Sequence, residues 1–426
     1  MATEQMQKCE KAGKKVGGKP IQNPGKSTEK APLTCSYRKS CGGCAYIGES
    51  YERQLQEKQR KVEKLLKPFG RVELIRGMGY PYYYRNKVQA VFGQKKNGDI
   101  VCGTYRKGTH SIVDIEDCLI QDRTATAIIR DIRDMLPSFR IRPYNEDTGY
   151  GLLRHVLIRR GYATGEVMVV LVTASPVFPS KNHFVKALLK KHPEITTVVQ
   201  NINDRRTSMV LGDQEKVLWG KGFITDELLG CRFRISARSF YQVNPVQTKH
   251  LYRAAVEFAG LNGKERALDA YCGTGTIGLI AAAKAKTVLG VELNRDAVKD
   301  AITNAKHNGI KNARFVCEDA GKFMEKAAAA GEKFDVVFMD PPRSGSSEAF
   351  LRALEKLAPE RVVYISCNPE TLARDLGVLK KMYRAERIQP FDMFPFADHC
   401  EVCVQLRYCK VAYEKQEPKK SAPLEP

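Results

Sequence analysis

The sequence predicts an α/β fold in which a doubly wound, mostly parallel sheet follows a smaller α+β domain. From about residue 265, short apolar segments typical of buried strands alternate with segments rich in helix-forming residues, an order that produces parallel sheets. Before that point, alternating apolar and polar residues between turn pairs indicate hairpins. The length of 426 residues suits two or three domains, each with its own core.

The charge balance points to a polyanionic partner. The chain has 70 Lys and Arg against 48 Asp and Glu, a formal net charge of +22, which favours attraction to nucleic acid or to an anionic membrane surface. A hydrophobic share of 43% argues against a disordered chain. No stretch approaches about 18 consecutive apolar residues, and the N-terminus lacks the apolar segment of a secretory signal. We therefore expect a cytoplasmic protein without a membrane-spanning helix.

Four regions are expected along the chain. Residues 1–34 are rich in Lys, Gly and Pro and are interpreted as a flexible basic tail. Residues 35–230 are expected to form the α+β domain, residues 231–413 the doubly wound domain, and residues 414–426 a charged tail. No internal repeat is evident.

The first domain shows one strong helix signal and several strand signals. Residues 51–66 lack Gly and Pro, are rich in helix formers and end just before Pro68, so we expect a helix there. Hairpins are expected within residues 80–120, where Asn97-Gly98 is a turn pair. Further strands are expected at 156–160, 167–173 and 196–203, with a helix near 181–191.

The second domain is expected to contain a series of buried strands separated by helices. Five of these strands are expected at residues 267–272, 287–293, 313–319, 334–340 and 361–367. A further strand is expected at residues 402–406.

A glycine-rich turn, DAYCGTGTIG from Asp269 to Gly278, follows the first of these strands and opens a helix. Its glycines permit a tight turn and close approach of the backbone to a ligand. The next strand ends at Glu292, where an acid can hydrogen-bond ribose hydroxyls, so a dinucleotide or S-adenosylmethionine fits. Acids near the ends of four successive strands favour S-adenosylmethionine, which has a cationic sulfur and no pyrophosphate. These acids are Asp269, Glu292, Glu318-Asp319 and Asp340.

Two motifs lie at the ends of the fourth and fifth strands of this series. The segment Asp340-Pro-Pro-Arg343 forms a stiff turn at the sheet edge where α/β proteins bind ligands. The segment Ser366-Cys367-Asn368-Pro369 ends the fifth strand and begins a helix. A helix N-terminus and nearby Arg side chains stabilise a thiolate, so Cys367 is predicted to be a reactive nucleophile.

A carboxylate precedes the strand at residues 402–406. Glu401 is a candidate general base if it lies against the same crevice. The neighbouring His399, Cys400 and Cys403 have zinc-binding side chains, but a strand directs alternate residues to opposite faces. This spacing is poor for a metal cage, and we do not assign zinc to it.

A thiolate, a carboxylate and a methyl donor together suit methylation of carbon 5 of uracil. That carbon is too weak a nucleophile to attack a sulfonium methyl group unaided. Addition of a thiolate to carbon 6 increases the electron density on carbon 5, which then accepts the methyl group. A base removes the proton from carbon 5, and elimination releases the cysteine. Methylation of an amine needs no such cysteine, so an N-methyltransferase is disfavoured.

These motifs resemble those of the RNA 5-methyluridine methyltransferases. The resemblance rests on SCNPETLARDL, DPPR, LDAYCGTG and the HxE segment near the C-terminus, and it covers nearly everything from Cys35 to Arg407. It implies a Rossmann-like S-adenosylmethionine-dependent methyltransferase domain in which Cys367 is the nucleophile and Glu401 the general base. It also implies contacts with the methyl donor at Gln242, Tyr271, Glu292 and Asp340.

Two further comparisons with the family concern single segments. Gln242 lies in Phe240-Tyr-Gln-Val-Asn244, which is similar to the family's FxQxN segment. The chain departs from the family pattern at Thr276, where many relatives have Asn, and at Ala397, where a Thr is usual.

Four cysteines form a second candidate site. Cys35, Cys41 and Cys44 lie close together in the sequence, and Cys118 follows much later. A reducing compartment disfavours disulfides, and four thiolates can hold either zinc or a [4Fe–4S] cluster; the spacing does not decide between them. The pattern is similar to that of the iron–sulfur-containing 23S rRNA type of the family, which favours [4Fe–4S] with a structural role, because the reaction transfers no electrons.

Basic and aromatic side chains alternate in the first domain and suit RNA. They are Arg38, Lys39, Arg53, Lys58, Arg60, Lys61 and Arg85, with Tyr37, Tyr46, Tyr82, Tyr83 and Tyr84. A target base must leave its stack to reach Cys367. The leading hypothesis is uracil-5 methylation of 23S rRNA, with the tRNA T-loop as the alternative substrate. A non-catalytic RNA-binding iron–sulfur protein is disfavoured by Cys367 and Glu401. No membrane and no obligate protein partner is inferred.

Overall fold

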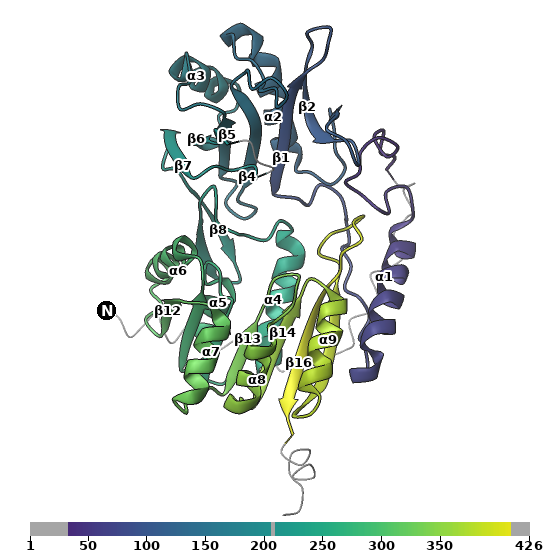
Figure 1. Cartoon of the computed structure of the whole chain (residues 1–426), viewed down its shortest axis with the longest axis vertical. Coiled ribbons are helices and arrows are strands. Elements are labelled where there is room, and N and C mark those ends of the chain that lie inside the picture. Colours follow the sequence, from purple (N-terminus) through teal and green to yellow (C-terminus); the bar gives the residue numbers. More distant parts are fainter. Residues whose placement is uncertain (1–32, 206–208, 410–426) are drawn as a thin grey trace, which may run out of the picture. The chain divides into compact units, whose positions relative to one another are not determined.

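The computed structural model describes residues 33–205 and 209–409 (Figure 1). The basic tail expected at residues 1–34 lies outside these ranges except for its last two residues, and so does the charged tail at 414–426. Within the described ranges no helix has the length and the apolar character needed to cross a membrane. The named strands of the described residues belong to two seven-stranded sheets and one hairpin.

The first sheet has the order β3-β2-β1-β4-β5-β6-β7. Neighbouring strands are antiparallel except β5 and β6, which are parallel and joined through α3 (Lys181–Lys191). The predicted hairpin at Asn97-Gly98 is confirmed, since Gln94 pairs with Ile100 across the turn and Gly98 has a φ of 95°. The strands are β1 (Lys87–Gln94), β2 (Ile100–Tyr105), β3 (Ile112–Asp114), β4 (Leu153–Arg160), β5 (Val167–Thr173), β6 (Ile195–Ile202) and β7 (Gln214–Trp219).

Helices α2 (Arg123–Met135) and α3 cover one face of this sheet. The buried side chains of Ile128 and Ile132 from α2 and Leu188 from α3 share a core with Val156 and Ile158 of β4. The opposite face of β4–β6 packs into a second core that continues into the rest of the protein. Strands β4 to β6 of the first sheet are therefore covered by apolar packing on both faces.

The second sheet has the order β12-β11-β10-β13-β14-β16-β15. Strands β10 to β14 are parallel, and β16 is antiparallel to both β14 and β15. The predicted doubly wound, mostly parallel sheet is confirmed. Its strands are β10 (Arg266–Ala270), β11 (Thr287–Glu292), β12 (Ala313–Cys317), β13 (Val336–Met339), β14 (Arg361–Ser366), β15 (Tyr383–Phe391) and β16 (Glu401–Tyr408).

Helices cover both faces of the second sheet. Successive residues of β13 point to opposite faces, so Phe338 joins the core beneath α4 and α5, whereas Val337 joins the core beneath α7, α8 and α9. The helices are α4 (Pro245–Ala259), α5 (Thr276–Ala282), α6 (Arg295–His307), α7 (Ala320–Ala329), α8 (Glu348–Leu357) and α9 (Pro369–Leu379).

Helix α1 (Tyr51–Leu66) packs on the second sheet although it precedes the first sheet in the chain. The helix has the bounds predicted from sequence, and the Ser50 side chain caps its start by accepting a hydrogen bond from the Arg53 N–H. Val62 and Leu66 share the core that contains Leu376 of α9. Figure 1 shows α1 beside α9. This placement brings an early segment of the chain next to the last strands of the second sheet.

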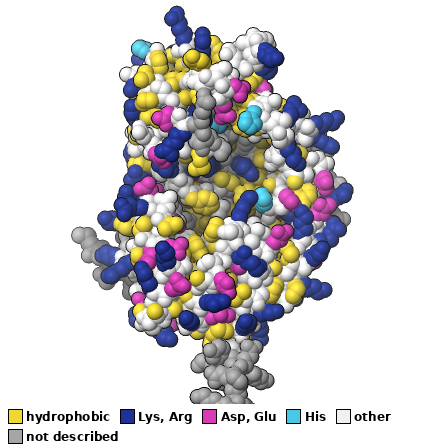
Figure 2. Space-filling model, in the orientation of Figure 1, with side chains coloured by type: hydrophobic (Ala, Val, Ile, Leu, Met, Phe, Trp, Pro, Cys, Tyr) yellow, Lys and Arg dark blue, Asp and Glu magenta, His cyan; other side chains and the backbone are white. Residues whose placement is uncertain are grey.

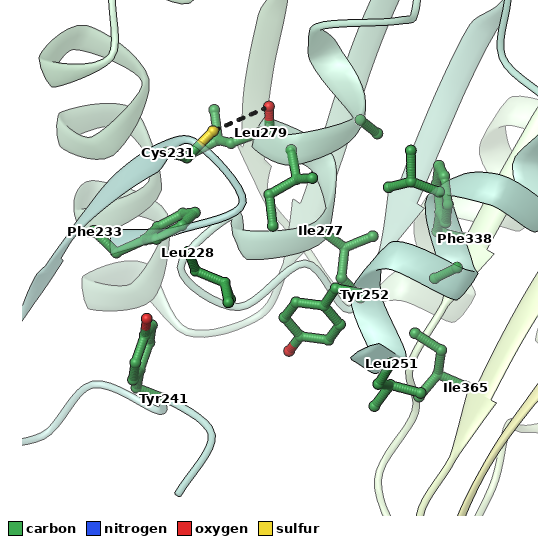
Figure 3. Close-up of a cluster of buried hydrophobic side chains, with 14 of the residues drawn as sticks. Leu228, Cys231, Phe233, Tyr241, Leu251, Tyr252, Ile277, Leu279, Phe338 and Ile365 are labelled. Atoms are coloured by element: carbon green, nitrogen blue, oxygen red, sulfur yellow. Dashed lines mark hydrogen bonds between the residues drawn. The ribbon is translucent and has the colours of Figure 1, made fainter. Parts of the chain in front are cut away.

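A small hairpin, β8 (Ile224–Leu228) with β9 (Cys231–Ile235), covers part of the same core as α4 and α5. Figure 3 shows Phe233 and Cys231 of this hairpin in the cluster with Ile277 and Leu279 of α5. The Cys231 thiol donates to the Leu279 carbonyl over 3.8 Å. Figure 2 shows Lys and Arg side chains spread over the face in view rather than gathered in one patch.

Candidate active site

The candidate site lies at the carboxyl edge of the second sheet. Strand β10 lies between β11 and β13, so the connections that leave β10 and β13 run to opposite sides and open a crevice at this edge. Four of the predicted site residues stand at strand ends here: Tyr271 after β10, Glu292 at the end of β11, Asp340 after β13 and Cys367 after β14. The topology thus brings these four residues to one edge.

The glycine-rich turn is held in place by the two acids that flank it. The Glu292 carboxylate accepts hydrogen bonds from the Gly273 N–H (3.1 Å) and the Asn294 N–H (2.7 Å). The Asp269 Oδ2 accepts from the Gly278 N–H over 2.8 Å, and a Cβ at Gly278 would lie 2.8 Å from that same oxygen. Glycine is therefore required at position 278 to keep the start of α5 on β10.

Two carboxyl groups at this edge have unusually high pKa values. Burial, followed by the neighbouring charges of Asp340 and Glu292, raises the pKa of Asp269 to about 7. Burial also raises the pKa of Asp340 to about 7. The second oxygen of Asp269, Oδ1, is buried and has no hydrogen-bond partner among the described residues. A cationic ligand would stabilise both carboxylates, and the glycine turn lets a ligand approach the protein backbone closely. These residues therefore fit S-adenosylmethionine.

Gln242 reaches the site from the segment before α4. Its side chain is buried and lies near the Tyr252 hydroxyl. Burial, with the charges of Asp340 and Glu401, raises the pKa of Tyr252 well above its usual value. In Figure 3 the Tyr252 hydroxyl points away from Ile277. Sequence reasoning missed Tyr252, and the Asn244-Pro245 start of α4 is the signal that could have placed it on a helix.

Cys367 and Glu401 lie opposite each other on neighbouring strands. Ser366, the last residue of β14, pairs with Val402 in an antiparallel register, so the next pair outward is Cys367 with Glu401. Cys367 is partly exposed, whereas Glu401 is 4% exposed. The thiol and the carboxyl group are therefore neighbours at the edge that carries Asp340.

The prediction of a stabilised thiolate at Cys367 is wrong for the ligand-free protein. Burial, followed by the charges of Glu401 and Asp340, raises the pKa of Cys367 to about 11, and Arg343 only partly opposes this. Burial and Asp340 likewise raise the pKa of Glu401 to about 8. The sequence indicated the helix N-terminus and the Arg, but it did not reveal that two carboxyl groups converge on the sulfur.

The SCNPETLARDL segment has a second role that the sequence did not reveal. On α9, Thr371 donates to the Arg343 carbonyl (3.2 Å) and Arg374 donates to the Ser344 carbonyl (2.9 Å). The buried Asp375 carboxylate accepts from the Ser346 N–H (2.9 Å) and from the Tyr364 hydroxyl (2.6 Å). Helix α9 therefore fixes the turn that follows Asp340.

A cavity of about 490 Å³ opens next to Cys367. It lies between α1, the start of α9 and the β15–β16 connection, and its lining is rich in basic side chains. Members of this lining include Lys61, Lys64, Arg343, Cys367, Asn368 and His399. The His399 Nε2 is 3.0 Å from an Arg343 nitrogen. The lining also contains Glu370 and Asp398, and Asp398 forms an ion pair with Lys61, so Lys64 and Arg343 are the Lys and Arg side chains of this cavity for which no ion pair is found among the described residues.

The four predicted metal-ligand cysteines line one small cavity, of about 30 Å³, away from the sheet edge. Burial raises the pKa of Cys44 to about 12, with further contributions from Cys118, Cys41 and Cys35, so the four sulfurs lie close enough to feel one another's charge. No three His, Cys, Asp or Glu side chains of the described residues are already arranged to hold a metal ion. The number and type of donors nevertheless fit a group held by four thiolates.

The fold and the arrangement of this edge define an S-adenosylmethionine-dependent methyltransferase. Comparison with known proteins identifies the family: the chain belongs to the tRNA (uracil-5-)-methyltransferase family, whose sequence model matches residues 50–409. The chain is thus an RNA methyltransferase, and the predicted family and Rossmann-like domain are confirmed.

Relatives with similar sequences and structures agree with this assignment. The chain is 43% identical over 381 residues to an uncharacterised RNA methyltransferase of Halalkalibacterium halodurans, covering 88% of this chain and 83% of that one. It is 41% identical over 398 residues to one of Clostridium acetobutylicum, covering 92% and 86%. The crystal structure of Pyrococcus abyssi tRNA (uracil-54, C5)-methyltransferase with S-adenosyl-L-homocysteine has a TM-score of 0.73 at 28% identity, covering 89% of this chain and 87% of that one.

Proposed function

We propose that this protein methylates carbon 5 of a uridine in RNA, with Cys367 as nucleophile and Glu401 as general base. The observation that carries this proposal is the register of β14 and β16, which sets the thiol opposite the carboxyl group at the edge that carries Asp340. A nucleophile and a base that act on adjacent ring carbons must lie next to one another, as residues at opposite positions of paired strands do.

The two residues have complementary tasks. Cys367, once its thiol has released its proton to solvent, adds as the thiolate: its sulfur forms a bond to carbon 6 of the uracil, and the electron pair of the ring double bond moves to carbon 5. S-adenosylmethionine, when bound, supplies the methyl group and a positive charge. Glu401 then accepts the proton from carbon 5, the ring double bond forms again, and the sulfur leaves with the electron pair of its bond to carbon 6. Arg343, which opposes the high pKa of both groups, favours the ionised thiol and carboxylate.

We assign the methyl-donor contacts to Gln242, Tyr271, Glu292 and Asp340. Their support is position: Tyr271 and Asp340 follow β10 and β13, Glu292 ends β11, and Gln242 lies near Tyr252, whose pKa is affected by Asp340. The basic cavity beside Cys367 supports RNA as the other substrate, since Lys64 and Arg343 can neutralise phosphates near a base that has left its stack.

Ribosomal RNA is the proposed substrate, because the cysteine pattern is similar to that of the 23S rRNA type of the family. Transfer RNA is a second candidate, which is favoured by the family name and by the Pyrococcus abyssi enzyme. Mass-spectrometric mapping of 5-methyluridine in both RNAs from cells lacking the gene separates the two. A residue lost from rRNA alone supports the proposal, and one lost from tRNA alone overturns it.

The mechanism has a direct chemical test. RNA containing 5-fluorouridine should form a stable covalent conjugate with the wild-type protein in the presence of methyl donor, because fluorine cannot leave carbon 5 as a proton does. The Cys367→Ala variant should form no conjugate and show no turnover while still binding RNA. The Glu401→Gln variant should accumulate a covalent protein–RNA species on ordinary uridine RNA, visible on a denaturing gel. Turnover by Cys367→Ala would contradict the mechanism.

We also propose a [4Fe–4S] cluster at Cys35, Cys41, Cys44 and Cys118, with a structural role. Support comes from the shared cavity and from the four-thiol donor set. Cysteines that hold a cluster must stay reduced rather than form disulfides. This requirement, together with an RNA substrate, favours a cytoplasmic location. Anaerobically purified protein should contain about four iron and four sulfide per chain. Stoichiometric zinc without sulfide would overturn the assignment.

A further inference from the structure

The connection between β15 and β16, residues 392–400, leads directly to Glu401. Strand β15 ends at Phe391, which pairs with Glu401, the first residue of β16. The path of the loop therefore affects where the Glu401 carboxyl group lies. Phe396 within the loop has a φ of 66°, a left-handed conformation that is an outlier for a bulky residue. Such a conformation persists only where the surroundings determine it.

Helix α1 supplies most of the contacts that hold the start of this loop. The Lys58 Nζ donates to the Asp392 carboxylate (2.5 Å) and to the Phe394 carbonyl (3.0 Å), and the side chains of Lys58 and Asp392 are both fully buried. The other Asp392 oxygen accepts from the Tyr51 hydroxyl (2.7 Å) and from the Gln54 amide (3.2 Å). Asp392 is thereby surrounded by donors from a single helix.

The strained residue of the loop is held at both its polar backbone atoms. The Phe396 N–H donates to the Gln54 side-chain oxygen (2.5 Å). The Phe396 carbonyl accepts from the N–H groups of Ala45 (2.8 Å) and Tyr46 (3.0 Å), which follow the cysteine Cys44 directly. The loop is therefore fixed to segments that lie more than 300 residues earlier in the chain.

We propose that Lys58 is a positioning residue for Glu401. Its ammonium group joins Asp392 to the Phe394 carbonyl and so sets the loop that aims the carboxyl group at carbon 5 of the target base. This inference rests on the proposed roles of Cys367 and Glu401. It assigns Lys58 to proton removal, the step after methyl transfer, and not to addition of the sulfur, because Glu401 directly follows the loop whereas Cys367 lies between β14 and α9.

The test separates the two steps on the full-length protein. The rate of conjugate formation with 5-fluorouridine RNA reports sulfur addition and methyl transfer, and turnover on uridine RNA also requires proton removal. In Lys58→Met we expect conjugate formation within about twofold of wild type, turnover reduced by roughly tenfold or more, and a covalent species that accumulates on uridine RNA.

Two further variants guard against misfolding, since a lone buried charge is costly. Lys58→Met combined with Asp392→Asn removes both charges. Tyr51→Phe keeps both charges and removes the hydroxyl that donates to Asp392 and accepts from the Met78 N–H. Both variants should show the same selective loss of turnover, and the loss should be smaller for Tyr51→Phe. The matched control is Arg361→Met, which breaks a buried ion pair with Glu265 at the opposite end of β14. It should lower stability without changing the ratio of the two rates.

The outcomes are distinct. If conjugate formation and turnover fall by the same factor in the Lys58 and Tyr51 variants, as for Arg361→Met, Lys58 has only a structural role and the inference is wrong. If neither rate changes, it is also wrong. If wild-type protein itself forms no fluorouridine conjugate, the proposed function fails, whatever the Lys58 variants do.

Discussion

At the scale of single residues, burial and then two neighbouring carboxyl groups outweigh the effect on the pKa of Cys367 of its place at the start of α9. The charges of Glu401 and then Asp340 add to the effect of burial, which is the largest cause of the raised pKa of the thiol. The ligand-free protein therefore keeps its proposed nucleophile protonated at neutral pH.

The rate at which Cys367 is alkylated in ligand-free protein should reveal the raised pKa of its thiol. Because the pKa of the thiol is about 11, the thiolate fraction, and with it the rate of reaction with iodoacetamide, should rise about tenfold per pH unit between about pH 7 and pH 10. Mass spectrometry of the peptide that contains Cys367 separates it from the other cysteines. Asp340→Asn should accelerate the reaction and Arg343→Gln should slow it. A rate that levels off below about pH 8 would contradict this account.

At the scale of elements, the sequence predicted what depends on local pattern. Helix α1 could be predicted because residues 51–66 lack Gly and Pro, and the parallel strands because each is a short apolar run. The ends of those strands in turn brought Tyr271, Glu292, Asp340 and Cys367 to one edge. Strand β15 was missed, since its charged residues and Pro390 hide the pattern.

What the sequence could not predict depends on contacts between distant segments. Lys58 and Asp392 are separated by 334 residues, and no local pattern relates them. The same holds for Tyr252, which meets Gln242 and Asp340 only once α4 has packed against the second sheet. The raised pKa of Cys367 was missed for the same reason.

The attachment of α9 to the DPPR turn predicts a large effect at Asp375. Asp375→Ala leaves the Ser346 N–H and the Tyr364 hydroxyl without their acceptor, so we expect the free energy of unfolding to fall by about 3 kcal/mol. Urea unfolding measures this change. Because the turn follows Asp340, calorimetry should also show weaker binding of S-adenosylmethionine.

The exposed Lys380, at the end of the same helix, supplies the control. Lys380→Ala should change the free energy of unfolding by less than about 0.5 kcal/mol. An equal decrease in the free energy of unfolding in the two variants would show that the helix itself, and not its hydrogen bonds to the turn, determines stability.

At the scale of the whole molecule, the site makes stability depend on pH. Asp269, Asp340 and Glu401 have pKa values of about 7, 7 and 8, well above the value of about 4 expected in an unfolded chain. Between about pH 4 and pH 7 the unfolded chain releases the protons of these three carboxyl groups while the folded protein retains them. The stabilisation is thus complete below about pH 4 and is lost as the pH rises toward 7 or 8.

Asp340→Asn isolates one of these contributions. The free energy of unfolding of the variant, relative to wild type, should increase by up to about 1.4 kcal/mol per pH unit from about pH 5 to pH 7, because the variant has no carboxyl group to ionise at that position. Urea unfolding of ligand-free protein at several pH values checks this. A difference that is constant with pH would show that Asp340 is already ionised in the folded protein.

The position of β16 between β14 and β15 has a consequence for protein synthesis. A nascent chain that has emerged only as far as residue 400 has already made the sulfur nucleophile assigned here, but neither its partner carboxylate nor the strand that completes the sheet. At roughly 5–20 residues per second, ribosomes need some tens of seconds to go from Lys58 to Asp392, and throughout that time the ammonium group lacks its counter-ion. The proposed reaction therefore requires that translation has passed β16, which carries Glu401.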